Sequence, residues 1–360
     1  MTRTSRAQCA LALILTLAGC RNSQTGPGDV RDQIWGVPDG YGRLTAAPVN
    51  LDELDFIVPL GWLNPPGHTF PADHIYFTFK DHTLRHDIYA PADGYISWVS
   101  HAAFTSENVD GSDYKISIQH TTTFSSYLDH VHFLDSTLIA ALGPERVGSF
   151  DVHIPVRAGQ RLGTTAGGNG GIVSIDLGVM NPAVTQCFVD PTHYNYGTLH
   201  ADSPLRYYDE PLRSTLYSMV RCDGNDKDGQ ICLDVDGTLA GNWFSEGAGP
   251  DDWNRELAFA VDPLHPGFRR IVMGGELGVA GITATRPTAP EPAMVTPQSG
   301  RVVYPLLGFD PNLGGRTYYV PIEGFLLVEM LTGRRVRVEL RWGSLDSLSD
   351  FGPMARIYTR

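Results

Sequence analysis

The stretch GYISWVSH (residues 94–101) alternates apolar and polar side chains, as a β-strand does when one of its faces is buried. Three further stretches share this pattern: DHIYFTFKD (73–81), YKISIQH (114–120) and IVSIDLGV (172–179). Helix is scarce, and we expect it from Ser136 to Leu142 and from Glu210 to Val220, the latter with Asp209 as its cap and Pro211 in its first turn. The first half of the chain is therefore predicted to be mostly antiparallel β.

Strand patterns resume in the second half, at ELAFAVD (256–262), RRIVMGG (269–275), RVVYPLL (301–307) and RTYYVPI (316–322). The strongest local pattern is a hairpin from Gly324 to Trp342, which turns at Thr332-Gly333. In its second strand apolar and charged residues alternate, so one face should be buried and the other wet. The proline-rich stretch TRPTAPEPAMVTPQ (285–298) is predicted to be a surface loop. We expect a second, small β-sandwich or barrel-like domain here.

The N-terminus carries the marks of a secretory signal, with Arg3 and Arg6 ahead of an apolar run from Ala10 to Leu17. The run is about half the length that a bilayer crossing needs. Leu17-Ala18-Gly19-Cys20 resembles the bacterial lipoprotein box, which implies a signal peptide at 1–19 and a lipid on Cys20 that anchors the chain to a membrane in the cell envelope. Arg21 stands where an aspartate would favour inner-membrane retention, which by analogy favours the outer membrane. The alternative is an ordinary signal peptide with a chance cysteine.

Charge excludes one class of partner. Without residues 1–19, which contain two arginines, the chain keeps 25 basic and 40 acidic residues, a net charge of −15. Binding to nucleic acid relies on clustered Lys and Arg, so a nucleic-acid partner is not expected. The predicted organisation is a lipidated Cys20 with a polar linker (20–45), a β domain (46–221), an acidic linker loop (222–237) and a C-terminal β domain (238–360).

The cysteines past Cys20 are Cys187, Cys222 and Cys232. In an oxidising compartment, Cys222 and Cys232 could close a short loop and leave Cys187 free, although sequence does not exclude pairings through Cys187. The loop between them is rich in aspartate, which allows either a solvated polar linker or a calcium site. Lys227 falls where an EF-hand would need an acid, so we favour the linker.

Histidine points to the first domain as the place for metal or proton chemistry, because eleven of the twelve histidines lie between residues 68 and 200. Three clusters stand out: His68 with Asp73 and His74, then Tyr127 to His132, then Ser174 to Val179. Residues two apart on a strand share a face, so widely separated segments can converge on one groove. A catalytic zinc needs three protein ligands and an open position for water. The alternative is that these histidines make ordinary hydrogen bonds in loops and edges.

From about residue 60 to 182 the chain resembles the lysostaphin-type zinc peptidoglycan endopeptidases. The resemblance is carried by YAPADGYI (89–96), by YLDHV (127–131) and by VRAGQRLG (156–163) with the glycines that follow it. It implies an antiparallel fold of the duplicated hybrid motif, zinc as cofactor, and peptidoglycan or another envelope polymer as partner.

The implied site departs from the family pattern. His74 falls on the first metal-binding histidine, but the aspartate expected four residues later is Thr78. The family's His-x-His is Ser174 and Asp176 here, and His130 matches the other catalytic histidine. In one interpretation the site is remodelled: His74 and Asp176 bind zinc with help from His68 or Asp73, and His130 handles protons. In a second, the metal site is lost and the groove binds an envelope polymer. In a third, the C-terminal domain serves adhesion or assembly.

Overall fold

The computed structural model describes residues 42–106, 109–168, 174–249, 252–285, 288–308, 320–343 and 350–360. It is mostly β, with 42% strand and 14% helix, as the sequence predicted. The signal segment, Cys20 and the linker up to residue 41 lie outside the described residues. No helix in the described part of the chain combines the length and hydropathy needed to cross a membrane.

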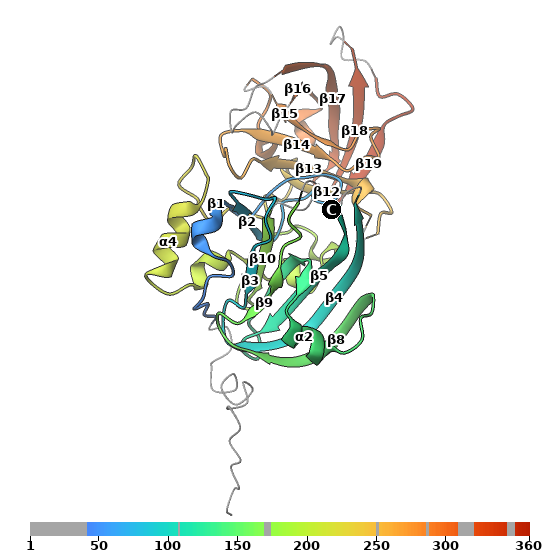
Figure 1. The fold of residues 1–360 in the computed structure, drawn as a ribbon. Helices are drawn as coiled ribbons and strands as arrows, with labels where there is room; N and C mark the ends of the chain where they lie inside the picture. Colours follow the sequence, from blue (N-terminus) through green and yellow to red (C-terminus); the bar gives the residue numbers. More distant parts are fainter. Residues whose placement is uncertain are drawn as a thin grey trace, which may run out of the picture.

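The first half of the chain forms an antiparallel sheet with the strand order β1-β2-β10-β6-β5-β4-β8, and β11 pairs with the end of β10 (Figure 1). In this order the strands are β1 (Leu54–Val58), β2 (Ile75–Phe79), β10 (Ser174–Met180), β6 (Ser125–Val131), β5 (Val109–Gln119), β4 (Gly94–Ser106), β8 (Gly148–Val156) and β11 (Ala201–Asp202). Strand β10 lies between strands that precede it by about fifty and a hundred residues. This placement sets Asp176 opposite both Tyr76 and Asp129.

The alternating patterns behave as expected in β2, where Ile75, Phe77 and Phe79 are buried and the residues between them are half-buried. Strand β10 differs from the expected half-buried pattern, because Ser174 to Val179 are all buried. A strand in the middle of a sheet loses solvent on both faces once each face is covered. Its polar side chains, Ser174 and Asp176, are therefore buried as well.

Smaller elements complete the first half. A second sheet has the order β3-β9-β7, and the helices follow the chain order α2, α3, α4. Their bounds are β3 (Asp87–Tyr89), β9 (Arg161–Thr164), β7 (Phe133–Leu134), α2 (Ser136–Leu142), α3 (Tyr196–Leu199) and α4 (Leu212–Met219), with 3-10 turns η1 (Leu51–Glu53), η2 (Pro191–His193) and η3 (Pro204–Tyr207). The prediction for α2 is confirmed. Helix α4 is shorter than expected, because Pro211 is its N-cap and the carboxylate of Asp209 pairs with Arg43 instead of capping the helix.

The second half closes into an eight-stranded antiparallel barrel with a core of its own around Trp243 (Figure 1). Its strands are β12 (Gly241–Ser245), β13 (Glu256–Val261), β14 (Arg269–Met273), β15 (Gly281–Thr285), β16 (Arg301–Gly308), β17 (Val320–Thr332), β18 (Arg335–Trp342) and β19 (Arg356–Thr359), with 3-10 turns η4 (Trp253–Arg255), η5 (Pro292–Met294) and η6 (Pro297–Ser299). The barrel-like domain expected from the sequence is confirmed.

The predicted hairpin is formed by β17 and β18, with Thr332 opposite Arg335. Val336 and Val338 point into the barrel core, as their alternation predicted. Glu339 was expected on the wet face but is buried, since its carboxylate accepts hydrogen bonds from Arg341 and from the backbone of Gly352. The described part of the proline-rich loop is also only partly exposed: Val295 packs into the barrel core.

The disulfide differs from the pairing expected. Cys187 is bonded to Cys232, with their Cα atoms 5.7 Å apart, and Cys222 is free. The nearest cysteine in sequence is not the partner because the segment from Cys232 to Asp234 packs against the loop after β10. There the Asp234 carboxylate accepts a hydrogen bond from the backbone of Val189. The bond therefore ties that loop to the chain entering the barrel.

The aspartates of the 222–237 segment are occupied by donors of the protein itself. Asp226 accepts from the backbone of Gly229, and Asp228 accepts from Tyr217 and Arg206. These bonds favour the structured linker over the calcium alternative.

Removing the Cys187–Cys232 bond is expected to lower the free energy of unfolding by up to about 4 kcal/mol, because it frees a loop of 45 residues in the unfolded chain. Urea unfolding of Cys187→Ser would measure the loss, with Cys222→Ser as the matched control expected within about 0.5 kcal/mol of the wild type. A loss in Cys222→Ser with none in Cys187→Ser would restore the pairing that the sequence suggested.

Candidate functional site

The sheet and the barrel enclose a cleft of about 470 Å³, and both contribute to its lining. The sheet wall carries charged side chains, and the barrel wall carries Asn242, Phe244, Trp253 and Glu256. All five metal or catalytic residues predicted from the sequence line this cleft: His68, Asp73, His74, His130 and Asp176.

Asp176 is the centre of the sheet wall. Its Oδ2 atom lies 3.1 Å from His74 Nε2 and 3.3 Å from His130 Nε2. The register of the sheet causes this meeting, because β10 carries Asp176 between β2, which begins just after His74, and β6, which contains His130. The hundred residues between His74 and Asp176 are thus bridged by strand pairing.

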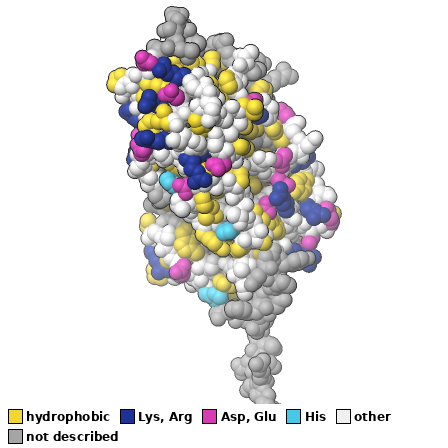
Figure 2. Space-filling view, turned by 180° about the vertical axis from the view of Figure 1, so that it is seen from behind, with side chains coloured by type: hydrophobic (Ala, Val, Ile, Leu, Met, Phe, Trp, Pro, Cys, Tyr) yellow, Lys and Arg dark blue, Asp and Glu magenta, His cyan; other side chains and the backbone are white. Residues whose placement is uncertain are grey.

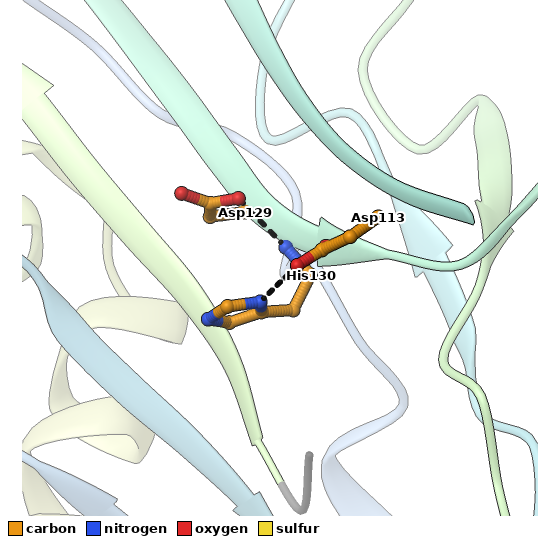
Figure 3. A group of neighbouring side chains, drawn as sticks. All are labelled: Asp113, Asp129 and His130. Carbon is orange, nitrogen blue, oxygen red and sulfur yellow. Dashed lines mark hydrogen bonds and ion pairs between the residues drawn. The ribbon is translucent and has the colours of Figure 1, made fainter. Parts of the chain in front are cut away.

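The backbone of His130 adopts a left-handed conformation with φ 69°, which is uncommon for a residue with a side chain. The Asp129 carboxylate accepts a hydrogen bond from the His130 backbone N–H at 3.0 Å (Figure 3). Such conformations cost energy and cluster at functional sites. Here the conformation directs the ring between Asp113 and Asp176.

A second set of partners holds the outer nitrogens of the two rings. Asp73 Oδ1 lies 3.1 Å from His74 Nδ1, and Asp113 Oδ2 lies 3.1 Å from His130 Nδ1. Asp73 is fixed in turn by the hydroxyls of Tyr127 and Thr198, which donate to it at 2.9 and 2.7 Å. Each imidazole therefore has a carboxylate close to both nitrogens, and an imidazole that donates at both nitrogens is protonated. The hydroxyls of Tyr127 and Tyr76 also lie 3.0 and 2.9 Å from Nδ1 and Nε2 of His74.

The electrostatics agree with that arrangement. Burial would lower the pKa of His74, but the carboxylates of Asp176 and Asp73 outweigh it and raise the pKa to about 9. Burial would also lower the pKa of His130, but Asp113 and Asp176 outweigh it and raise the pKa to about 10. Burial would raise the pKa of Asp176, yet the two imidazolium rings hold it well below its usual range.

His68 differs from the other two histidines, since burial and the charge of His74 lower its pKa to about 4. At neutral pH the sheet wall therefore holds two imidazolium rings around the Asp176 carboxylate, with a neutral His68 beside them.

These residues do not fit a catalytic zinc at His74 and Asp176. Thr78 stands where the resemblance implies an aspartate ligand, and it faces Ser174, which stands where the resemblance implies a catalytic histidine. A hydroxyl therefore replaces one ligand and another replaces the proton-transfer group. Among the described residues, no group of three or more side chains close enough to share a metal ion includes His74 or Asp176.

The described side chains close enough to share a metal ion are Asp113, Asp129 and His130, whose ligand atoms lie within 4.8 Å of one another (Figure 3). Lys115 already neutralises part of this group, with its ammonium 3.2 Å from Asp129. A cation bound there would have to displace that ammonium.

Several residues that line the cleft or hold its side chains were not predicted. Asp113 and Lys115 stand two apart on one strand, so their shared face was a usable signal. Thr198 and the barrel wall carried no such signal, because nothing in a local pattern tells which surface of one domain faces another.

No protein-family model matches the chain, and neither does any curated protein. Among solved structures, the chain is similar to a zinc-containing peptidase from Vibrio cholerae, with a TM-score of 0.26 and 15% identity over 38% of this chain and 37% of that one. It is also similar to the SpoIIQ–SpoIIIAH pore-forming complex, with a TM-score of 0.29 and 12% identity over 49% of this chain and 96% of the matched chain. The match spans little more than a third of the peptidase, and at these scores neither likeness decides what the cleft does.

Proposed function

We propose that this chain is a cell-envelope lipoprotein whose cleft binds peptidoglycan without cleaving it. The observation that carries the proposal is that Asp176 Oδ2 is shared by His74 and His130. The residue that stands where the family resemblance puts a metal ligand is thus paired, through this oxygen, with two histidines.

Hydrolysis of an amide needs an activated water, which a metal ion or a general base supplies. His74 and His130 keep their protons at neutral pH, since their pKa values are raised to about 9 and 10. The carboxylate of Asp176 is neutralised by both rings and is a weak base, because its pKa lies far below neutral. The three residues are therefore suited to holding charged groups and poorly suited to removing a proton from water.

The cleft offers chemistry that suits a peptide-bearing polymer. Its sheet wall carries both signs of charge, with Lys115 beside Asp129 and imidazolium rings beside Asp73 and Asp176. Peptidoglycan stem peptides carry carboxylates and, in many cases, amines. On the face shown in Figure 2, Lys and Arg side chains lie beside Asp and Glu side chains, so the described residues of that face carry both signs of charge. The lipid anchor expected at Cys20 would keep the cleft near the cell wall, on the outer membrane.

The full lipoprotein is expected to sediment with insoluble peptidoglycan, to contain less than stoichiometric zinc, and to release no new amine ends. Lys115→Gln, inside the cleft, should weaken binding about tenfold, about 1.4 kcal/mol. Lys80→Gln is the matched control and is expected to bind normally. The Lys80 ammonium donates to the Asp52 carbonyl, away from the cleft.

The other two functions predict different results. Stoichiometric zinc, with amine release that Asp176→Ala abolishes, would identify a zinc endopeptidase. Failure to sediment, with a co-purifying envelope protein, would identify an assembly role.

A further inference from the structure

Two residues that line the cleft, one on each wall, each carry a buried oxygen that lacks a hydrogen-bond partner among the described residues. These oxygens are Oδ1 of Asp176 on the sheet and Oδ1 of Asn242 on the barrel, and both residues are 2% exposed. A buried acceptor left unpaired is costly, and native proteins rarely keep one without a reason. Both atoms accept hydrogen bonds, so what this cleft lacks is a donor.

The position of Asn242 is built into the fold. Its side-chain nitrogen donates to the Tyr194 hydroxyl at 3.1 Å, and its backbone N–H donates to Asp234 at 2.9 Å. The preceding Gly241 has φ 101° and packs so tightly on Asp234 that a Cβ would lie 2.1 Å from the carboxylate. The same carboxylate accepts a hydrogen bond from the backbone N–H of Val189 in the loop after β10. Asn242 is therefore held in place before any ligand arrives.

The barrel wall has the composition of a cation site. Besides Asn242 it presents the rings of Phe244 and Trp253 and the carboxylate of Glu256, and no Lys or Arg is among its lining residues. An ammonium group supplies three donors, is attracted to carboxylates, and binds favourably over aromatic faces. Trp253 is 53% exposed, so its ring remains accessible to a ligand.

We propose that the barrel wall, with Asn242 at its base and Trp253 at its rim, is a subsite for the free primary amine of a peptidoglycan stem peptide. The inference rests on the proposed function and adds which chemical group is recognised and by which domain. The ammonium donates to Asn242 Oδ1 and lies against the Trp253 ring.

The test compares native peptidoglycan sacculi that carry free stem-peptide amines with the same sacculi after acetylation of those amines, using the full lipoprotein. Acetylation is expected to weaken sedimentation about tenfold, since it removes the charge and two of the donors. Trp253→Ala should bind native sacculi as weakly as the wild type binds acetylated ones. Trp342→Ala is the matched control, because this barrel tryptophan is 63% exposed and is not part of the cleft lining.

The outcomes separate the two proposals. Equal binding of native and acetylated sacculi overturns the amine subsite and leaves the proposed function standing. Binding to neither overturns both. Asn242→Leu, with its thermal midpoint measured alongside, should reproduce the effect of Trp253→Ala; if it fails to fold, the Trp253 comparison still decides.

Discussion

Asp176→Asn is expected to lower the free energy of unfolding at pH 6 by about 3–5 kcal/mol, the usual cost of removing one partner from a buried ion pair. The isosteric amide leaves His74 and His130 facing each other without the negative charge that holds their protons. Urea unfolding of the full chain would measure the loss. Asp55→Asn is the control: its pair with Arg221 is about half exposed on both sides, so a change within about 1 kcal/mol is expected.

The same network predicts how stability depends on pH. Because the pKa values of His74 and His130 are raised from 6.5 to about 9 and about 10, their contribution is complete below pH 6.5 and is lost as pH rises through those values. Asp176 acts in the opposite direction: its pKa is lowered from 3.8, so its contribution is present above that value and is lost in acid. Wild-type stability from this network should therefore be greatest between about pH 4 and 6.5 and fall by several kcal/mol by pH 10, since each unit of pKa shift is worth about 1.4 kcal/mol. Parallel pH profiles for the wild type and Asp176→Asn would show that the network does not exist in solution.

Arg360→Ala is expected to lower the free energy of unfolding by about 3–5 kcal/mol, although Arg360 is the last residue of the printed sequence. The guanidinium is almost fully buried and donates to the backbone carbonyls of Ala240, Val235 and Thr238. It also lies 4.1 Å from the centre of the Trp243 ring. Alanine would leave those carbonyls without donors where the chain enters the barrel. In Figure 1 the C-terminus lies at this junction.

Two variants test whether the loss of stability comes from these hydrogen bonds or from the loss of a positive charge. Arg360→Lys keeps the charge but loses the planar fork, so an intermediate loss is expected. Arg334→Ala removes an arginine that is 58% exposed and pairs with Asp236 at 3.6 Å, and a change within about 0.5 kcal/mol is expected. Thermal and urea unfolding would measure all three. Equal stability of Arg360→Ala and Arg334→Ala would contradict the role assigned to the C-terminal residue.

Local pattern determined many of the elements. The alternation in DHIYFTFKD placed β2, the run from Ser136 to Leu142 placed α2, and the alternation from Val336 to Leu340 placed the hairpin of β17 and β18. These features depend on the period of buried side chains over a few residues, which a sequence shows directly. The alternation alone gave a wrong prediction at Glu339. Its side chain is buried because Arg341 and Gly352 supply hydrogen-bond donors.

The sequence by itself also singled out residues that lie together, because His68, Asp73, His74, His130 and Asp176 all line one cleft. The metal and catalytic roles expected of them remain predictions. What only the tertiary structure decided is what surrounds them: two rings on one Asp176 oxygen, the Cys187–Cys232 bond, and a barrel wall led by Asn242. The physical reason is that strand pairing, disulfide choice and domain contact join segments tens to hundreds of residues apart. Their outcome depends on packing and loop closure over the whole chain, which a local pattern does not encode.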